Sequence, residues 1–83
     1  MDRNQISGAI VDAAMKVHSA LGPGLLESAY AACLRHELIK HGLKVASEVP
    51  VPVVYDGIRL DAGYKLDLLI EDTVVVELKA IEA

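Results

Sequence analysis

The chain has 83 residues, the size of one domain with a thin hydrophobic core. Its net charge of −4 argues against strong non-specific binding to nucleic acid, because such binding comes from Lys and Arg neutralising phosphates. Apolar residues make up 53% of the chain although Phe and Trp are absent. We therefore expect a second subunit or a further segment of chain to cover apolar surface.

Membrane and zinc-binding functions find no support in the sequence. The apolar runs are interrupted by charge before they reach the length of about 18 residues that a membrane-spanning helix needs, and no signal peptide is recognisable. We expect a cytoplasmic protein without a membrane partner. The single cysteine, Cys33, lies on the apolar stripe of a predicted helix, which favours a buried thiol. Cys33 and the three histidines lack the spacing of zinc ligands.

Two helices are predicted in the first half of the chain. Apolar residues recur at helical spacing over residues 5–21, and Asn4 is the expected N-cap. A second helix is expected over residues 25–41, where Gly42 ends it and Leu43 can make the apolar contact that accompanies such an ending. Since the link between the helices is short, they should pack antiparallel or at a sharp angle.

The second half of the chain is rich in Val and begins with a predicted hairpin. The dipeptide Asp56-Gly57 between apolar runs is typical of a two-residue hairpin turn. Pro50 and Pro52 share one parity, so their missing N–H groups point the same way. This pattern predicts an outer strand whose free side is unpaired.

A third strand is expected over residues 63–70 and a fourth over residues 73–81, which completes an antiparallel meander of four strands. The predicted fold class is α/β of the α+β type, with the helices on one face of the sheet. The other face and one edge would be open, and natural proteins usually cover such an edge. We therefore expect either a missing C-terminal portion or a homo-oligomer in which a partner subunit covers the sheet.

Three charged residues, Asp67, Glu77 and Lys79, interrupt the last two predicted strands. Glu77 and Lys79 share a face because side chains alternate along a strand. Asp67 joins them if it lies opposite Glu77 across the hairpin, since directly opposed residues share a face. This register requires an odd turn, and we predict the three-residue turn 71–73. An even turn would place Asp67 on the other face.

With this register the Cβ atoms of Asp67 and Glu77 would lie about 5 Å apart. Mg²⁺ is commonly held by one or two carboxylates together with water and substrate phosphate. The pair could thus bind Mg²⁺ or Mn²⁺, while Lys79 orients an attacking water or stabilises negative charge. The alternative is that all three residues are ordinary surface charges on half-exposed strands, and the spacing taken alone favours that alternative.

Two motifs resemble those of a known family. Asp67 followed by the run Glu77-Leu78-Lys79 resembles the PD-(D/E)XK nuclease signature, with Leu66 in place of its proline. The segment GLLESAY, residues 24–30, resembles the motif of the GxxExxY protein family, and the similarity extends over essentially the whole chain. The resemblance implies a restriction-endonuclease-like fold in which a sheet carries an acidic site.

The resemblance also implies roles for individual residues. Asp67 and Glu77 would be metal ligands, and Lys79 would be the catalytic lysine. Glu27, the motif glutamate, would be a further metal ligand or catalytic acidic residue near the same ion, with Tyr30 packed beneath it or hydrogen-bonded to it. Without the resemblance, Glu27 is a carboxylate that stabilises the N-terminal turn of its helix.

Members of the family usually continue with a further helix and strand, so residues 1–83 resemble one PD-(D/E)XK-like domain that is incomplete at its C-terminus. Two functions remain open. The first is a metal-dependent nuclease that hydrolyses nucleic-acid phosphodiesters, inactive if the missing segment is essential. The second is a non-catalytic binding or oligomeric assembly module on the same fold. The strand charges favour the first, and the negative net charge and the expected lack of a C-terminal segment favour the second.

Overall fold

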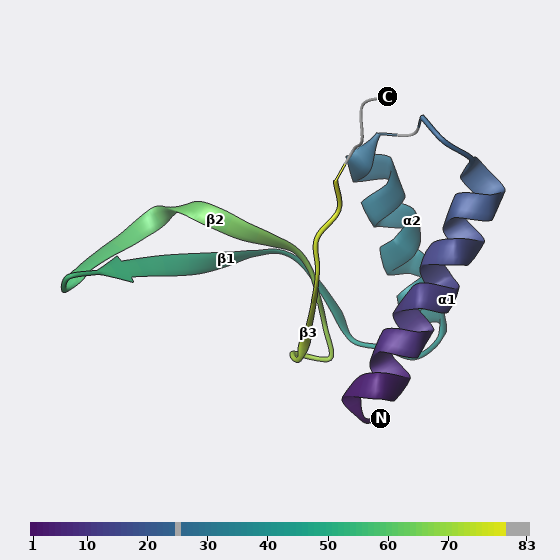
Figure 1. Ribbon diagram of the computed structural model, residues 1–83, viewed down its shortest axis with the longest axis horizontal. Coiled ribbons are helices and arrows are strands. Elements are labelled where there is room, and N and C mark those ends of the chain that lie inside the picture. The colour runs from purple at the N-terminus through teal and green to yellow at the C-terminus, as the bar shows by residue number, and fades with distance from the viewer. Residues whose placement is uncertain (25, 80–83) are drawn as a thin grey trace.

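The computed structural model of the protein describes residues 1–24 and 26–79, and for residues 61–63 it describes the backbone alone. Two helices precede three strands, namely α1 (Arg3–Leu21), α2 (Glu27–Lys40), β1 (Val45–Tyr55), β2 (Ile58–Ile70) and β3 (Val74–Val76). The strands form an antiparallel sheet in the order β1-β2-β3. Both helices lie beside one end of the sheet, and β1 and β2 continue beyond them as a long hairpin (Figure 1). The predicted α+β class is confirmed.

The predicted number of strands is corrected by the structure. The expected second and third strands are joined into the continuous β2, so that the described part of the chain has a three-stranded sheet. The register between β1 and β2 shifts between Val51 and Val53. The shift lies where the sequence predicted a break between two strands, and β2 is continuous across it. β1 is an outer strand, as Pro50 and Pro52 predicted.

The N-terminus of α1 differs from the prediction by two residues. Asp2, not Asn4, is the N-cap: its carboxylate accepts a hydrogen bond from the Gln5 N–H, and the Gln5 side-chain oxygen accepts one from the Asp2 N–H, both at 2.8 Å. This reciprocal pair satisfies two N–H groups at once, which a cap at Asn4 would not achieve with the residues that follow it.

The C-terminus of α2 is the one that the sequence predicted. Gly42 has φ of +85°, a conformation that favours glycine. The Gly42 N–H donates to the Ile39 carbonyl and the Leu43 N–H donates to the Leu38 carbonyl, the two bonds of a Schellman motif. Leu43 is buried with 4% exposure. The helix begins at Glu27; the predicted start at residue 25 lies outside the described residues.

The core lies between the helices and the sheet. Four side chains are at most 1% exposed, two from α2 and two from β2: Leu34, Leu38, Leu68 and Ile70. Residues of α1 and β3 pack around them, including Ile6, Ala13, Val74 and Val76. On the opposite face of the sheet, Val75 is 47% exposed, so the helices cover one face as expected. Cys33 is half-buried, and it is therefore less enclosed than the sequence suggested.

Both hairpin turns follow their sequence signals. Asp56 and Gly57 have φ of +49° and +77°, as a two-residue turn with positive φ at both positions requires. Between β2 and β3, Leu68 pairs with Val76 and Ile70 pairs with Val74. These pairs centre the turn on Asp72, and the predicted odd turn of residues 71–73 is confirmed.

Candidate functional site

The β2–β3 register determines how Asp67 lies relative to Glu77. Continuing the pairing of Leu68 with Val76 by one residue sets position 67 opposite position 77, as the sequence predicted. However, β3 ends at Val76, and the residues that follow leave the ladder. The Leu78 N–H donates to the Asp67 carboxylate at 2.8 Å. Half-buried Asp67 therefore holds the segment after β3 against β2.

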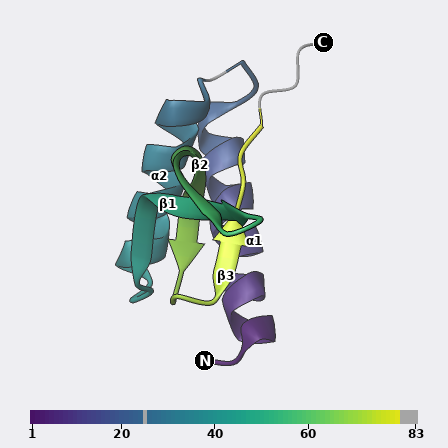
Figure 2. The same cartoon turned by 90° about the vertical axis from the view of Figure 1, so that its left-hand side faces the viewer.

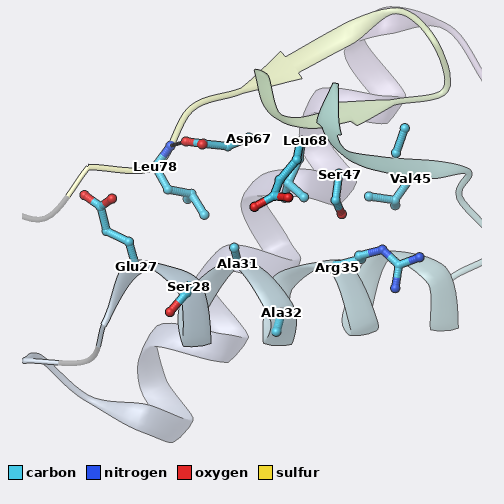
Figure 3. A pocket seen from close by; sticks show the side chains of 12 residues that line it. Glu27, Ser28, Ala31, Ala32, Arg35, Val45, Ser47, Asp67, Leu68 and Leu78 are labelled. Carbon is cyan, nitrogen blue, oxygen red and sulfur yellow. Dashed lines mark hydrogen bonds between the residues drawn. The ribbon is translucent and has the colours of Figure 1, made fainter. Parts of the chain in front are cut away.

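Asp67 lines a cleft between α2 and the sheet, and this cleft has a volume of about 670 Å³. Glu27 lines the same cleft from the first turn of α2, and its carboxylate and that of Asp67 lie on either side of Leu78, with the Asp67 carboxylate turned towards the Leu78 N–H (Figure 3). Leu78 lies beside both of them (Figure 3). The cleft thus brings together the helix-borne glutamate and the strand-borne aspartate that the sequence singled out.

A second cleft of about 1050 Å³ adjoins the first and contains the other predicted residues. Glu77 and Lys79 line it, and Glu27 and Leu78 line both clefts. Glu27 is therefore the predicted residue common to the two clefts, and Leu78 lies where they adjoin. Within the described ranges 1–24 and 26–79, no three His, Cys, Asp or Glu side chains converge to hold a metal ion. The ligand roles of these carboxylates stay predictions.

Tyr30 connects the two helices. Its hydroxyl donates a hydrogen bond to the Ala14 carbonyl of α1 at 2.9 Å. Of the two expected arrangements, packing beneath Glu27 or a hydrogen bond to it, the hydrogen bond is replaced by this one, which fixes α2 against α1. Tyr30 and Glu27 both line the second cleft. His18, at the end of α1, lines this cleft as well.

Sequence reasoning missed Glu48, which lines the first cleft with Asp67. Ser47 pairs with Leu68 and Val49 pairs with Leu66, so Glu48 lies opposite Asp67 in the β1–β2 register. Its φ of +50° is unusual for a residue other than glycine in a strand. A glutamate in a Val-rich strand was a weak signal, and its place beside Asp67 depends on a register between segments far apart in the sequence. Arg35 of α2 also lines this cleft.

Glu77 affects a tyrosine of β2. The Tyr64 hydroxyl donates to the Glu77 carboxylate at 3.2 Å. This hydrogen bond, together with the negative charge of Glu77, raises the pKa of Tyr64 above its ordinary value, because a phenolate beside a carboxylate is disfavoured. Burial and the charge of Asp67 add smaller effects in the same direction.

We expect the substitution Glu77→Gln to lower the pKa of Tyr64 towards its ordinary value of about 10. The raised pKa favours the folded state below that value, and this contribution is lost as the pH rises through the folded-state pKa. Titration of phenolate absorbance measures the shift, with Tyr64→Phe identifying the signal among the three tyrosines. An unchanged titration in Glu77→Gln would show that the hydrogen bond does not persist in solution.

An antiparallel meander covered on one face by two helices, with carboxylates from a helix and a strand facing a common cleft, is an arrangement on which acid- and metal-assisted chemistry can be built. The chain matches the family model of the PD-(D/E)XK nuclease superfamily over residues 4–83, and it belongs to this superfamily. Neither the curated proteins nor the solved structures contain a match. None of the described helices is both long and apolar enough to cross a membrane.

Proposed function

We propose that this protein is a nuclease domain of the GxxExxY type, which hydrolyses nucleic-acid phosphodiester bonds with the help of Mg²⁺ or Mn²⁺. The superfamily membership supports a nuclease-like function. The observation that carries the proposal is the position of Glu27, which lines both the cleft of Asp67 and the cleft of Glu77 and Lys79. The signature residues line two adjoining clefts that share Glu27 at the N-terminal end of α2, which supports the proposal.

The donor set suits a hard divalent cation. Glu27, Asp67 and Glu77 offer carboxylate oxygens, the ligands that Mg²⁺ prefers. Mg²⁺ usually keeps several waters and needs one or two direct carboxylates, so three converging ligands are not required. We propose that Asp67 and Glu27 are the carboxylates that hold the ion in the first cleft. Glu77 lies in the adjoining second cleft. A bound ion would polarise the phosphate and lower the pKa of a water molecule.

The protein's own groups would position the substrate. The exposed ammonium of Lys79 borders the second cleft, where it would stabilise the negative charge that develops on the phosphate. Arg35 lines the first cleft and would contact a neighbouring phosphate, because its guanidinium matches phosphate geometry. Lys79 and Arg35 would attract the phosphates of the nucleic acid locally, although the whole chain has a net charge of −4.

Isothermal titration calorimetry with Mg²⁺ and with Mn²⁺ tests the metal site. We expect the wild type to bind and the variant Asp67→Asn to bind at least about tenfold more weakly, because one charged ligand is lost. Asp12→Asn is the matched control, since exposed Asp12 of α1 lies outside both clefts. Equal affinities of Asp67→Asn and wild type would overturn the assignment of Asp67 as a ligand.

A second candidate function, a non-catalytic assembly module, is favoured by one feature outside the clefts. The hairpin of β1 and β2 extends beyond the helices and exposes apolar side chains, which suits association with another chain.

A further inference from the structure

The part of the β1–β2 hairpin that extends beyond the helices, residues 51–64, is called the arm below. Figure 1 shows the arm leaving the body of the protein, and Figure 2 looks down it from its tip. Six of its apolar side chains are between 37% and 75% exposed: Val51, Val53, Tyr55, Ile58, Leu60 and Tyr64. A soluble protein rarely leaves so many neighbouring apolar side chains uncovered.

These six side chains lie on one face of the arm. The ladder pairs Val51 with Tyr64, Val53 with Leu60 and Tyr55 with Ile58, and directly paired residues share a face. This surface, called the apolar arm face, contains three apolar pairs, and the register shift between Val51 and Val53 separates the first pair from the other two. Among the side chains of the arm that the structure describes, this face carries no charge.

The opposite face of the hairpin is more polar. There Val54 pairs with Arg59, and Pro50 pairs with Lys65. A one-sided distribution of this kind is typical of an antiparallel hairpin that packs one face against other protein and leaves the second face in water.

The apolar arm face continues the surface that packs against the helices. Along β2, Tyr64 has the same parity as Leu66, Leu68 and Ile70, and the last two are fully buried beneath the helices. The core pattern of the strand therefore extends further along the sheet than the helix layer does. The alternation of apolar residues is that of a buried surface, yet the side chains of the apolar arm face are exposed in the single chain.

The accessible surface and the radius of gyration are both larger than those of a compact chain of this size, as expected if another chain covers the arm. Its accessible surface is 6168 Å², whereas a compact protein of 8.9 kDa exposes about 4,800 Å². Its radius of gyration is 14.4 Å, compared with about 12 Å for a compact chain of this length. The excess surface is larger than the area of about 800 Å² that each partner contributes to a standard protein interface.

We propose that the apolar arm face packs against the same face of a second copy of this chain and forms a dimer with two-fold symmetry. An uncharged face can pack against itself, whereas nucleic acid would require basic side chains. Pro50 and Pro52 remove N–H donors from the outer strand β1, which disfavours association through the sheet edge. Two arms would instead stack face to face, about 10 Å apart.

Neighbouring residues of β1 provide a matched test. Val53 belongs to the central pair of the apolar arm face, and Val54 lies on the opposite face. They are 44% and 67% exposed, so a lysine at either position can reach water in the single chain. Sedimentation equilibrium of wild type, Val53→Lys and Val54→Lys should be measured up to about 100 µM, where a micromolar dimer is populated.

We expect the wild type and Val54→Lys to have the mass of two chains. Val53→Lys should raise the dissociation constant at least about 30-fold, because it buries a charge at the centre of the interface. Ile58→Lys, 60% exposed near the tip, should also weaken the dimer, and circular dichroism checks that each variant folds. A monomeric wild type at every concentration, a mass that grows beyond two chains, or equal effects at positions 53 and 54 would overturn the proposal.

Discussion

Replacement of Asp67 by Asn is expected to reduce metal-dependent hydrolysis of nucleic acid by at least about 100-fold, because a charged ligand of the metal is lost from the cleft. The asparagine keeps a side-chain oxygen that can accept the hydrogen bond from the Leu78 N–H. The fold should therefore be retained, and the loss can be assigned to the charge. Initial rates on single-stranded and double-stranded DNA and RNA measure the effect and identify the substrate class.

Two further variants separate catalysis from structure. Asp12→Asn should leave the rate unchanged, since Asp12 lies outside both clefts. Asp67→Ala should lose activity and also lower the melting temperature below that of Asp67→Asn, because the Leu78 N–H loses its acceptor. Full activity in Asp67→Asn would show that Asp67 is not a metal ligand and only holds the segment after β3 against β2. No hydrolysis by the wild type on any of the four substrates would contradict the nuclease and favour the assembly module.

Replacement of Leu38 by Ala is expected to lower the free energy of unfolding by about 2 to 5 kcal/mol. Leu38 has 0% exposure and belongs to the cluster that joins α2 to β2. The whole domain should be stable by about 4 to 12 kcal/mol, so this single cavity removes a large share of it. Urea denaturation followed by circular dichroism measures the change.

The neighbouring residue Ile39 is the control for this cavity. Ile39 is 45% exposed on the same helix, and Ile39→Ala should cost less than about 1 kcal/mol. If both variants lost the same stability, helix formation by α2, and not its packing against the sheet, would be what stabilises the domain.

Local signals in the sequence predicted much of the architecture. Gly42 with Leu43 predicted the end of α2, and Asp56-Gly57 predicted the first hairpin turn. The need to set position 67 opposite position 77 predicted the odd second turn. Each of these features depends on a few consecutive residues or on the alternation of side chains along one strand. Such local patterns can be recognised in the sequence alone. The cap at Asp2 was missed because two good capping residues lie close together.

The arrangement of the candidate site could not be predicted in the same way. Alternation predicts that Glu77 shares a face with Asp67, yet β3 ends at Val76 and Leu78 turns its N–H towards Asp67. The signature residues consequently line two adjoining clefts. Glu48 joins the first cleft through the register of β1 with β2, to which no spacing in the sequence pointed.

The sequence by itself determined that two helices precede an antiparallel meander, where α2 ends, both hairpin turns, the pairing of the last two strands and the membership of the superfamily. These properties follow from backbone preferences and side-chain alternation, which act over short distances along the chain. The tertiary structure decided which carboxylates share a cleft and how far the sheet extends beyond its helices. Both depend on where a strand leaves its ladder and on where the helix layer stops, because packing between distant segments sets those limits.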